Sequence, residues 1–338
     1  MNYQAIVSMS AHILNNNPHQ AIMVWGPPGC GKSHAMTQAL PTQLGLPTDA
    51  VMMFRPSNHD PVDVTGLPVV TEDRTRWSPP DFLLKANEKA EQYGRSLLVI
   101  DEINQSVPMM FNILNGLILD RHVSAFHLHP GVHIVATGNR QTDKAASNRM
   151  PAHTANRLCH FDMESDLNGF TKYWLSQDLP IWVISYINMK PNNLNAFNPD
   201  ERCNPTERSW ELFAKAAGDD LPLEMTATLA KSFLGEGVAA ELAAFRKIES
   251  EMPNPDGCLI DPKGSALPTS IHAKYAIAGA LAQRANKGNF DAVLQYMGRI
   301  EKQFEVLCVR IAFGKKPEVL ATKAGIQWAA DNANVFAA

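Results

Sequence analysis

Gly26-Pro27-Pro28-Gly29-Cys30-Gly31-Lys32-Ser33 is the stretch that decides the fold of this chain. It follows an apolar run at 21–25 and precedes a helical pattern of apolar residues at 35–40. A glycine-rich turn with this spacing, between a strand and a helix, is typical of a phosphate-binding loop, because backbone N–H groups and the helix N-terminus together surround a phosphate. The stretch therefore predicts a nucleotide site; a glycine-rich turn that resembles one by chance is the weaker alternative.

Two side chains of this stretch have chemical roles in such a loop. Lys32 would reach the β- and γ-phosphates of the nucleotide, and the Ser33 hydroxyl would be a ligand of Mg²⁺. We therefore expect ATP and Mg²⁺ as cofactors. The residues predicted to bind the nucleotide here are Gly26, Pro27, Pro28, Gly29, Cys30, Gly31, Lys32, Ser33 and His34.

The composition is that of an ordinary globular protein. The chain has 338 residues, of which 45% are hydrophobic and 19% charged, and a formal net charge of -4. Binding to nucleic acid is not indicated, because a protein that neutralises phosphate backbones usually carries a clustered excess of Lys and Arg. At this length we expect two or three compact units.

The five cysteines are widely spaced and include no Cys-x-x-Cys pair. This pattern favours reduced thiols over a disulfide framework or a zinc site. No signal peptide is visible at the start of the sequence, and no apolar run reaches the ~18 residues that a membrane span needs. The expectation is therefore a cytoplasmic protein without membrane association.

A second apolar run, 97–100, ends in Asp101 and Glu102. Such a run predicts a central parallel strand with catalytic or ligand-binding residues at its carboxyl end. Asp101 would hold Mg²⁺, and Glu102 would act as general base toward the attacking water. In isolation, two acids after a strand are commonly only a solvated strand end.

Another strand, at 132–136, is followed by Asn139. A polar amide at the carboxyl end of a strand beside the phosphate loop can orient water toward the γ-phosphate, so Asn139 is the candidate for that role. The alternative is an asparagine that merely caps a turn. Further on, Arg157 could supply positive charge to the transition state; a surface ion pair is the alternative use, and Arg149 competes for the same role.

Beyond residue 165 the strand signals disappear and helical patterns separated by Pro, Asn and Gly fill the chain, including one predicted helix at 290–310. Arg208, at the start of one of these helices, could fold back onto the nucleotide. Two segments of the first part, 57–79 and 120–131, are predicted to be functional loops because of their length and position.

Taken together, the phosphate loop, Asp101-Glu102, Asn139, Arg157 and Arg208 resemble the AAA+ ATPases. More narrowly, Asp60-Pro61-Val62-Asp63 with Gly66-Leu67-Pro68, the strand end 101–104 and Gly138-Asn139-Arg140 look like the MoxR-like ATPases of the dynein-related branch. The resemblance implies that Asn139 is a first sensor, Arg157 an arginine finger acting on a neighbouring subunit, and Arg208 a second sensor. It also implies a homo-oligomer, typically a hexameric ring, and a partner with a von Willebrand factor A domain. It places such a protein in the cytoplasm of a bacterial or phage-infected cell.

The predicted fold class is thus an α/β P-loop NTPase (AAA+) core with a parallel sheet, followed by an all-helical lid and a helical C-terminal extension. The boundaries are 1–163 for the core, 164–250 for the lid and 251–338 for the extension. The function that follows is ATP hydrolysis at subunit interfaces of a ring, used to remodel or assemble an unidentified protein client. The alternatives are a scaffolding ring locked by nucleotide with little turnover, a nucleic-acid translocase and, more weakly, a small-molecule P-loop kinase.

Overall fold

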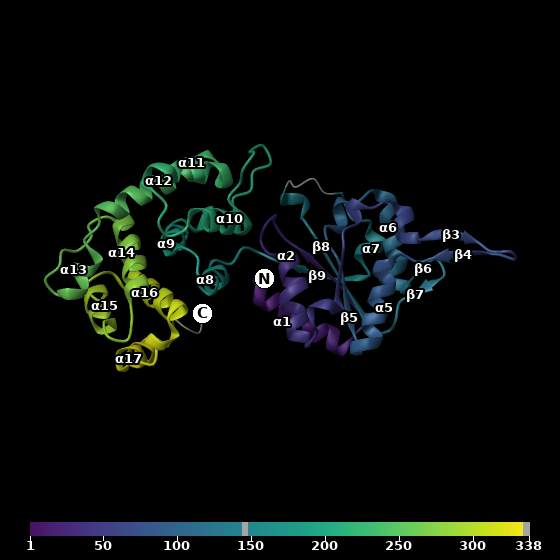
Figure 1. Ribbon diagram of the computed structural model, residues 1–338, viewed down its shortest axis with the longest axis horizontal. Coiled ribbons are helices and arrows are strands. Elements are labelled where there is room, and N and C mark those ends of the chain that lie inside the picture. The colour runs from purple at the N-terminus through teal and green to yellow at the C-terminus, as the bar shows by residue number, and fades with distance from the viewer. Residues whose placement is uncertain (144–147, 334–338) are drawn as a thin grey trace. The chain divides into compact units, whose positions relative to one another are not determined.

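The computed structural model describes residues 1–143 and 148–333. The chain divides into two compact units, Met1–Asp166 with Phe197–Pro199, and Leu167–Ala196 with the residues from Asp200 onward. The first unit contains all strands of the described residues, and the second is helical (Figure 1). The predicted order of an α/β unit followed by a helical part is therefore confirmed.

A five-stranded parallel sheet forms the centre of the first unit, in the order β2-β5-β8-β1-β9. Every residue of β5 and β8 is buried, because helices cover both faces. This explains why the two strands read as nearly continuous apolar runs. The strands of the sheet are β1 (Ala21–Trp25), β2 (Val51–Phe54), β5 (Ser96–Ile100), β8 (Val132–Gly138) and β9 (Leu158–Asp162).

Alternate residues of each strand pack into two separate apolar clusters, one on each face of the sheet. On one face, Ile22 and Val24 of β1 pack with residues of α1 and of the helical segment after the phosphate loop. On the other face, Met23 of β1 packs with residues of α5 and α6. The unit is thus a three-layer α/β/α sandwich. Its helices are α1 (Tyr3–Asn16), α2 (Lys32–His34), α3 (Leu40–Leu44), α4 (Pro61–Thr65), α5 (Asp81–Tyr93), α6 (Pro108–Asn115) and α7 (Ala152–Ala155).

The helical segment that follows the phosphate loop is continuous but irregular. Between α2 and α3 lies a π-helical turn, Ala35–Ala39. Pro41 stands in the first turn of α3. Because proline has no N–H to donate to a carbonyl one turn earlier, a local change of helical pitch is expected beside it.

The two segments predicted to be functional loops, 57–79 and 120–131, both contain hairpins. The first carries α4 and the antiparallel pair β3 (Leu67–Val70) and β4 (Thr75–Ser78), whose residues are all exposed. Figure 1 shows this hairpin extending away from the central sheet. The second contains the short pair β6 (His122–Val123) and β7 (Phe126–His127). Neither hairpin is part of the five-stranded sheet.

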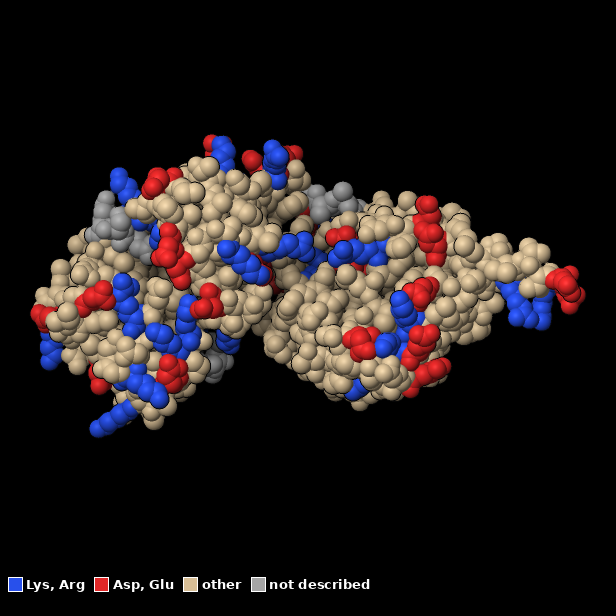
Figure 2. Space-filling view, in the orientation of Figure 1, with Lys and Arg blue, Asp and Glu red and all other residues tan. Residues whose placement is uncertain are grey.

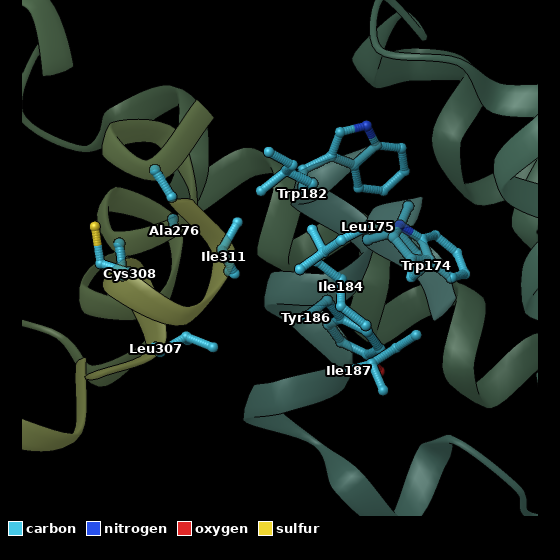
Figure 3. Close-up of a cluster of buried hydrophobic side chains, with 14 of the residues drawn as sticks. Trp174, Leu175, Trp182, Ile184, Tyr186, Ile187, Ala276, Leu307, Cys308 and Ile311 are labelled. Atoms are coloured by element: carbon cyan, nitrogen blue, oxygen red, sulfur yellow. The ribbon is translucent and has the colours of Figure 1, made fainter. Parts of the chain in front are cut away.

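The second unit is built around one apolar cluster that extends from residue 170 to residue 328. Trp174 and Trp182 belong to its first two helices, and Ile311 to a helix near the end of the unit (Figure 3). The helices are α8 (Leu167–Ser176), α9 (Ile181–Met189), α10 (Glu207–Ala217), α11 (Leu223–Leu234), α12 (Glu236–Glu251), α13 (Pro255–Ile260), α14 (Ile271–Arg284), α15 (Phe290–Met297), α16 (Lys302–Lys315) and α17 (Lys323–Asp331).

The second unit departs from the predicted helix at 290–310. It contains α15 and α16 there, separated by residues 298–301, where Gly298 ends the first helix. The subdivision of this part into a lid (164–250) and an extension (251–338) stays a prediction. Among the described residues, no helix combines the length and the apolar character needed to cross a bilayer.

Candidate functional site

The phosphate loop connects β1 to α2 at the carboxyl edge of the sheet. Gly29 and Gly31 have φ angles of 77° and 92°, in the left-handed region where a side chain is strained. These two glycines therefore allow the chain to make the tight turn that brings Lys32 to the first position of α2.

Lys32 is largely buried, with 8% of its surface exposed. Its ammonium group donates hydrogen bonds to the carbonyl oxygens of Gly26 and Pro27, both at 2.8 Å, and to Oδ1 of Asn139 at 2.9 Å. A buried charge is tolerated only when such partners satisfy it. The structure thus brings Lys32 and Asn139 together, although they are 107 positions apart in the chain.

Asp101 is the most enclosed acidic residue of the site, with 1% of its surface exposed. Its Oδ1 accepts hydrogen bonds from the hydroxyls of Ser33, at 2.7 Å, and Thr137, at 2.5 Å, and its Oδ2 accepts one from Nε of Arg55 at 2.9 Å. Burial acts to raise the pKa of Asp101, but the hydrogen bonds from Thr137, Ser33 and Arg55 outweigh it and hold the pKa below its usual value. The carboxylate is therefore ionised at neutral pH.

Strand register explains why these residues meet. Phe54 pairs with Ile100, and Ile100 pairs with Ala136. The residues that follow, Arg55, Asp101 and Thr137, are consequently neighbours at the carboxyl edge of three adjacent strands. Sequence reasoning missed Arg55 and Thr137 because their roles depend on which strands are adjacent.

Glu102 has a φ of 56°, an uncommon value for a residue other than glycine. Its N–H donates to the Thr137 hydroxyl at 3.3 Å. Its partly buried carboxylate forms no hydrogen bond or ion pair with any residue of 1–143 or 148–333. Backbone strain of this kind persists when the surroundings hold the residue in place, as the hydrogen bond to the Thr137 hydroxyl does here.

Asn104 holds the backbone of Asn139 and is the third residue whose structural role sequence reasoning missed. Its Nδ2 donates to the carbonyl oxygen of Asn139 at 2.7 Å, and its Oδ1 accepts from the N–H of Asn139 at 3.3 Å. The Asn104 carbonyl in turn accepts from the N–H of Asn148 at 2.7 Å. Asn139 is therefore fixed through its main chain, which leaves its side chain for Lys32.

For the three arginines predicted to act on the nucleotide, no side-chain hydrogen bond or ion pair joins them to this network among the described residues. Arg157 immediately precedes β9, and Leu158 pairs with Ala21 at the start of β1, so Arg157 lies at the edge of the sheet opposite the phosphate loop. Arg149 follows Asn148, which is anchored to Asn104, and its side chain is exposed. Arg208 lies in the first turn of α10 in the second unit. The roles of all three arginines stay predictions.

The sequence around the site is similar to a known protein family. Residues 21–158 match the model of the AAA domain (dynein-related subfamily). The match spans β1 to the start of β9 and includes the phosphate loop, Asp101-Glu102 and Asn139. This part of the chain is therefore similar to an AAA domain, and the parallel sheet followed by helices is typical of a P-loop AAA+ core. No curated protein is significantly similar in sequence.

Three solved structures resemble the chain weakly. A closed-state reconstruction of Hsp104 with ATPγS and casein is 14% identical, with a TM-score of 0.38, and the similarity covers 72% of this chain and 46% of that one. Brucella abortus NtrX with ADP is 11% identical (TM-score 0.40; 98% and 68% covered). A Thermotoga maritima RuvB mutant is 12% identical (TM-score 0.38; 71% and 67% covered). The chain thus spans about half the length of the Hsp104 chain, and similarities this low carry no functional conclusion.

Proposed function

We propose that this chain hydrolyses ATP at the boundaries between its own copies in a ring, and that it uses the reaction to remodel or assemble a partner protein, as a MoxR-like ATPase. One observation carries the hydrolytic part of the proposal. The two side chains of the phosphate loop that are predicted to contact the phosphates and Mg²⁺ are hydrogen-bonded to residues at the carboxyl ends of other strands. Lys32 donates to Asn139, and Ser33 donates to Asp101.

The residues around Asp101 fit a magnesium ion. The Ser33 hydroxyl and the Asp101 carboxylate are both oxygen donors and lie 2.7 Å apart, and Mg²⁺ prefers a small number of such ligands beside substrate phosphates. Ser33 and Asp101 would therefore hold the ion. When bound, Mg²⁺ neutralises charge on the β- and γ-phosphates.

The other residues of the site have separate roles in hydrolysis. Lys32 holds the phosphates by charge-assisted hydrogen bonds. Glu102 accepts a proton from the attacking water, since its carboxylate has no competing partner among the described residues. Asn139, fixed by Asn104, orients that water. Arg208 from the helical unit would respond to the bound nucleotide as a second sensor.

The position of Arg157 supports action on a neighbouring copy. Strand residues advance by about 3.3 Å each, so the five residues of β1 separate Arg157 from its own phosphate loop by roughly 16 Å. That distance exceeds the reach of an arginine side chain. Within the described residues, no hydrogen bond or ion pair holds its guanidinium. Arg157 is therefore available to the nucleotide of a second copy.

The surroundings of Arg157 also suit a phosphate of another copy. It lines an open cavity of about 670 Å³ together with His12, Asn16, Gln20 and Asn156, and none of the lining residues is acidic. The full lining is His12, Ile13, Asn16, Asn17, Gln20, Leu119, Asn156, Arg157, Leu158 and Cys159. An anionic group brought to this face would meet amides and one cation and no opposing carboxylate.

Mixing two inactive variants tests action across a boundary. We expect Arg157→Ala to lower the ATP turnover of the assembled protein by about 10³-fold or more, the typical contribution of an arginine in trans. Mixed with Glu102→Gln, it should regain a measurable part of the wild-type rate. In the mixture, some sites combine Glu102 of one copy with Arg157 of the next. Turnover per subunit should also rise with protein concentration until assembly is complete.

Arg149→Ala is the matched control for this experiment. It removes the same group from the residue that competes for the role and should retain wild-type turnover. Full activity of Arg157→Ala, together with complementation between Arg149→Ala and Glu102→Gln, would assign the finger to Arg149 instead. Loss of activity in Arg157→Ala without recovery in the mixture would contradict action in trans.

We place a partner protein at the β3–β4 hairpin. Leu67, Val70 and Trp77 are 63%, 80% and 46% exposed, and exposed apolar side chains gathered on one element mark interaction sites. A protein partner is favoured over nucleic acid because charges of both signs are interspersed on the face shown in Figure 2. The partner could carry a von Willebrand factor A domain, and the client remains to be identified. All five cysteines are free thiols, which is consistent with a cytoplasmic setting.

Removal of the hairpin tests whether it is free for a partner or is instead needed to form the ring. Replacing residues 67–78 with a short glycine-serine linker should leave ATP-dependent assembly, followed by sedimentation of the Glu102→Gln protein, unchanged, because the hairpin lies outside the central sheet. Nucleotide affinity should stay within about 2-fold of the parent, since no residue of the site belongs to the hairpin. Loss of assembly in the deletion variant would instead make the hairpin a ring-forming element.

A further inference from the structure

Both oxygens of the Asp101 carboxylate already accept hydrogen bonds from residues of its own chain. Ser33 and Thr137 donate to Oδ1, and Nε of Arg55 donates to Oδ2 at 2.9 Å. The Asp101 side chain is 1% exposed and that of Arg55 is 43% exposed. Within residues 1–143 and 148–333, Arg55 is thus the one cation paired with Asp101, and its side chain is the more exposed of the two.

The contact made by Arg55 is easy to exchange. A single hydrogen bond, through Nε, joins its guanidinium to Asp101, and one further nitrogen lies 4.0 Å from the Met53 sulfur. Strong arginine–carboxylate pairs usually use two parallel hydrogen bonds. A half-exposed guanidinium can turn outward at the cost of its one hydrogen bond to Asp101 and a long, weak hydrogen bond to the Met53 sulfur.

A magnesium ion at Ser33 and Asp101 would act on the same carboxylate as Arg55. Two cations beside one buried carboxylate repel each other more strongly than they would in water, because the local dielectric constant is low. Resting on the proposed function, we propose that Arg55 is a positioning residue that holds Asp101 in place and competes with Mg²⁺ for it, so that Arg55 sets the Mg²⁺ dependence of nucleotide binding.

The competition makes a thermodynamic prediction that does not involve turnover. Binding of a fluorescent ADP analogue is measured by equilibrium titration in EDTA and in Mg²⁺, and the ratio of the two affinities is the factor by which Mg²⁺ tightens binding. For Arg55→Gln we expect this factor to be about 5-fold larger than in the wild type, the lower end of couplings between sites. The use of a ratio cancels any general loss of attraction between Arg55 and the anionic nucleotide.

Thermal melting gives a second, independent readout. Without Arg55, the buried Asp101 carboxylate loses its cation, so Arg55→Gln should melt about 2–5 °C below the wild type in EDTA. In Mg²⁺ and ADP the difference should shrink, because the ion replaces the missing charge. A merely structural arginine would lower the melting temperature equally under both conditions.

Two further variants serve as matched controls. Arg55→Lys keeps the charge and should stay close to the wild type in the Mg²⁺ factor. Lys287→Gln makes the same charge change at an exposed position of the second unit and should match the wild type in both assays. A larger Mg²⁺ factor in Lys287→Gln would show that net charge alone is responsible and would overturn the proposal.

The outcomes separate this proposal from the one on which it rests. A wild-type protein that binds the ADP analogue, combined with an unchanged or smaller Mg²⁺ factor in Arg55→Gln, would overturn the role of Arg55 alone. A wild-type protein that binds no nucleotide would overturn the proposed function and, with it, the role of Arg55. An enlarged factor together with a melting difference that Mg²⁺ and ADP reduce would support both.

Discussion

Glu102→Gln is expected to lower ATP turnover by about 10²–10⁴-fold, the usual contribution of a positioned general base. Glutamine has nearly the same shape as glutamate but cannot accept a proton from water. The backbone contact of residue 102, an N–H donated to the Thr137 hydroxyl, does not depend on the side chain and should persist. The substitution should therefore slow ATP hydrolysis and keep the nucleotide affinity within about 2-fold of the wild type.

Turnover is measured by phosphate release at saturating ATP, and affinity by titration with a fluorescent ADP analogue. Glu91→Gln is the matched control, since Glu91 lies exposed on α5 and the same change there should alter neither quantity. A Glu102→Gln protein that keeps more than about a tenth of wild-type turnover would contradict the role of Glu102 as general base.

Lys32→Ala is expected to weaken nucleotide binding by about 10–100-fold, because charge-assisted hydrogen bonds contribute ~1.5–3 kcal/mol each. The ammonium group closes the loop by joining two loop carbonyls to Asn139. Its removal takes away the charge that faces the phosphates and also the link to Asn139. We therefore expect turnover to fall further than binding, since Asn139 would lose its position as well.

Lys85→Ala provides the comparison for this substitution. Lys85 forms an exposed ion pair with Asp81 on α5, and exposed pairs of this kind contribute little to stability. Binding of the ADP analogue, measured in parallel on both variants, should change only in Lys32→Ala. Equal binding in Lys32→Ala and wild type would show that the loop is not the nucleotide site.

Three strands of the central sheet could be predicted because each is a short, largely apolar run that is directly followed by residues able to bind nucleotide or take part in hydrolysis. The phosphate loop follows β1, Asp101 follows β5, and Asn139 follows β8. Parallel strands place their carboxyl ends on one edge, so the meeting of Lys32, Asp101 and Asn139 follows from the fold class. That much of the candidate site was accessible from local sequence.

The parts that could not be predicted depend on pairing between distant segments. Arg55 follows β2, and only the order β2-β5 and its register place it opposite Asp101. The β3–β4 hairpin is exposed on both faces and so lacks the apolar alternation that marks a half-buried strand. The predicted helix at 290–310 failed because apolar spacing continues across Gly298, where α15 ends.

Thr137 is hydrogen-bonded to both acidic residues of the site, Asp101 and Glu102, and belongs to a buried strand. Its hydroxyl donates to Asp101 and accepts from the amide of Glu102, and it belongs to β8, which is buried along its whole length. β8 lies between β5 and β1. We therefore expect the amides at the acidic end of the site to be among the slowest of the first unit to exchange, and the site to open together with the sheet rather than as a surface loop does.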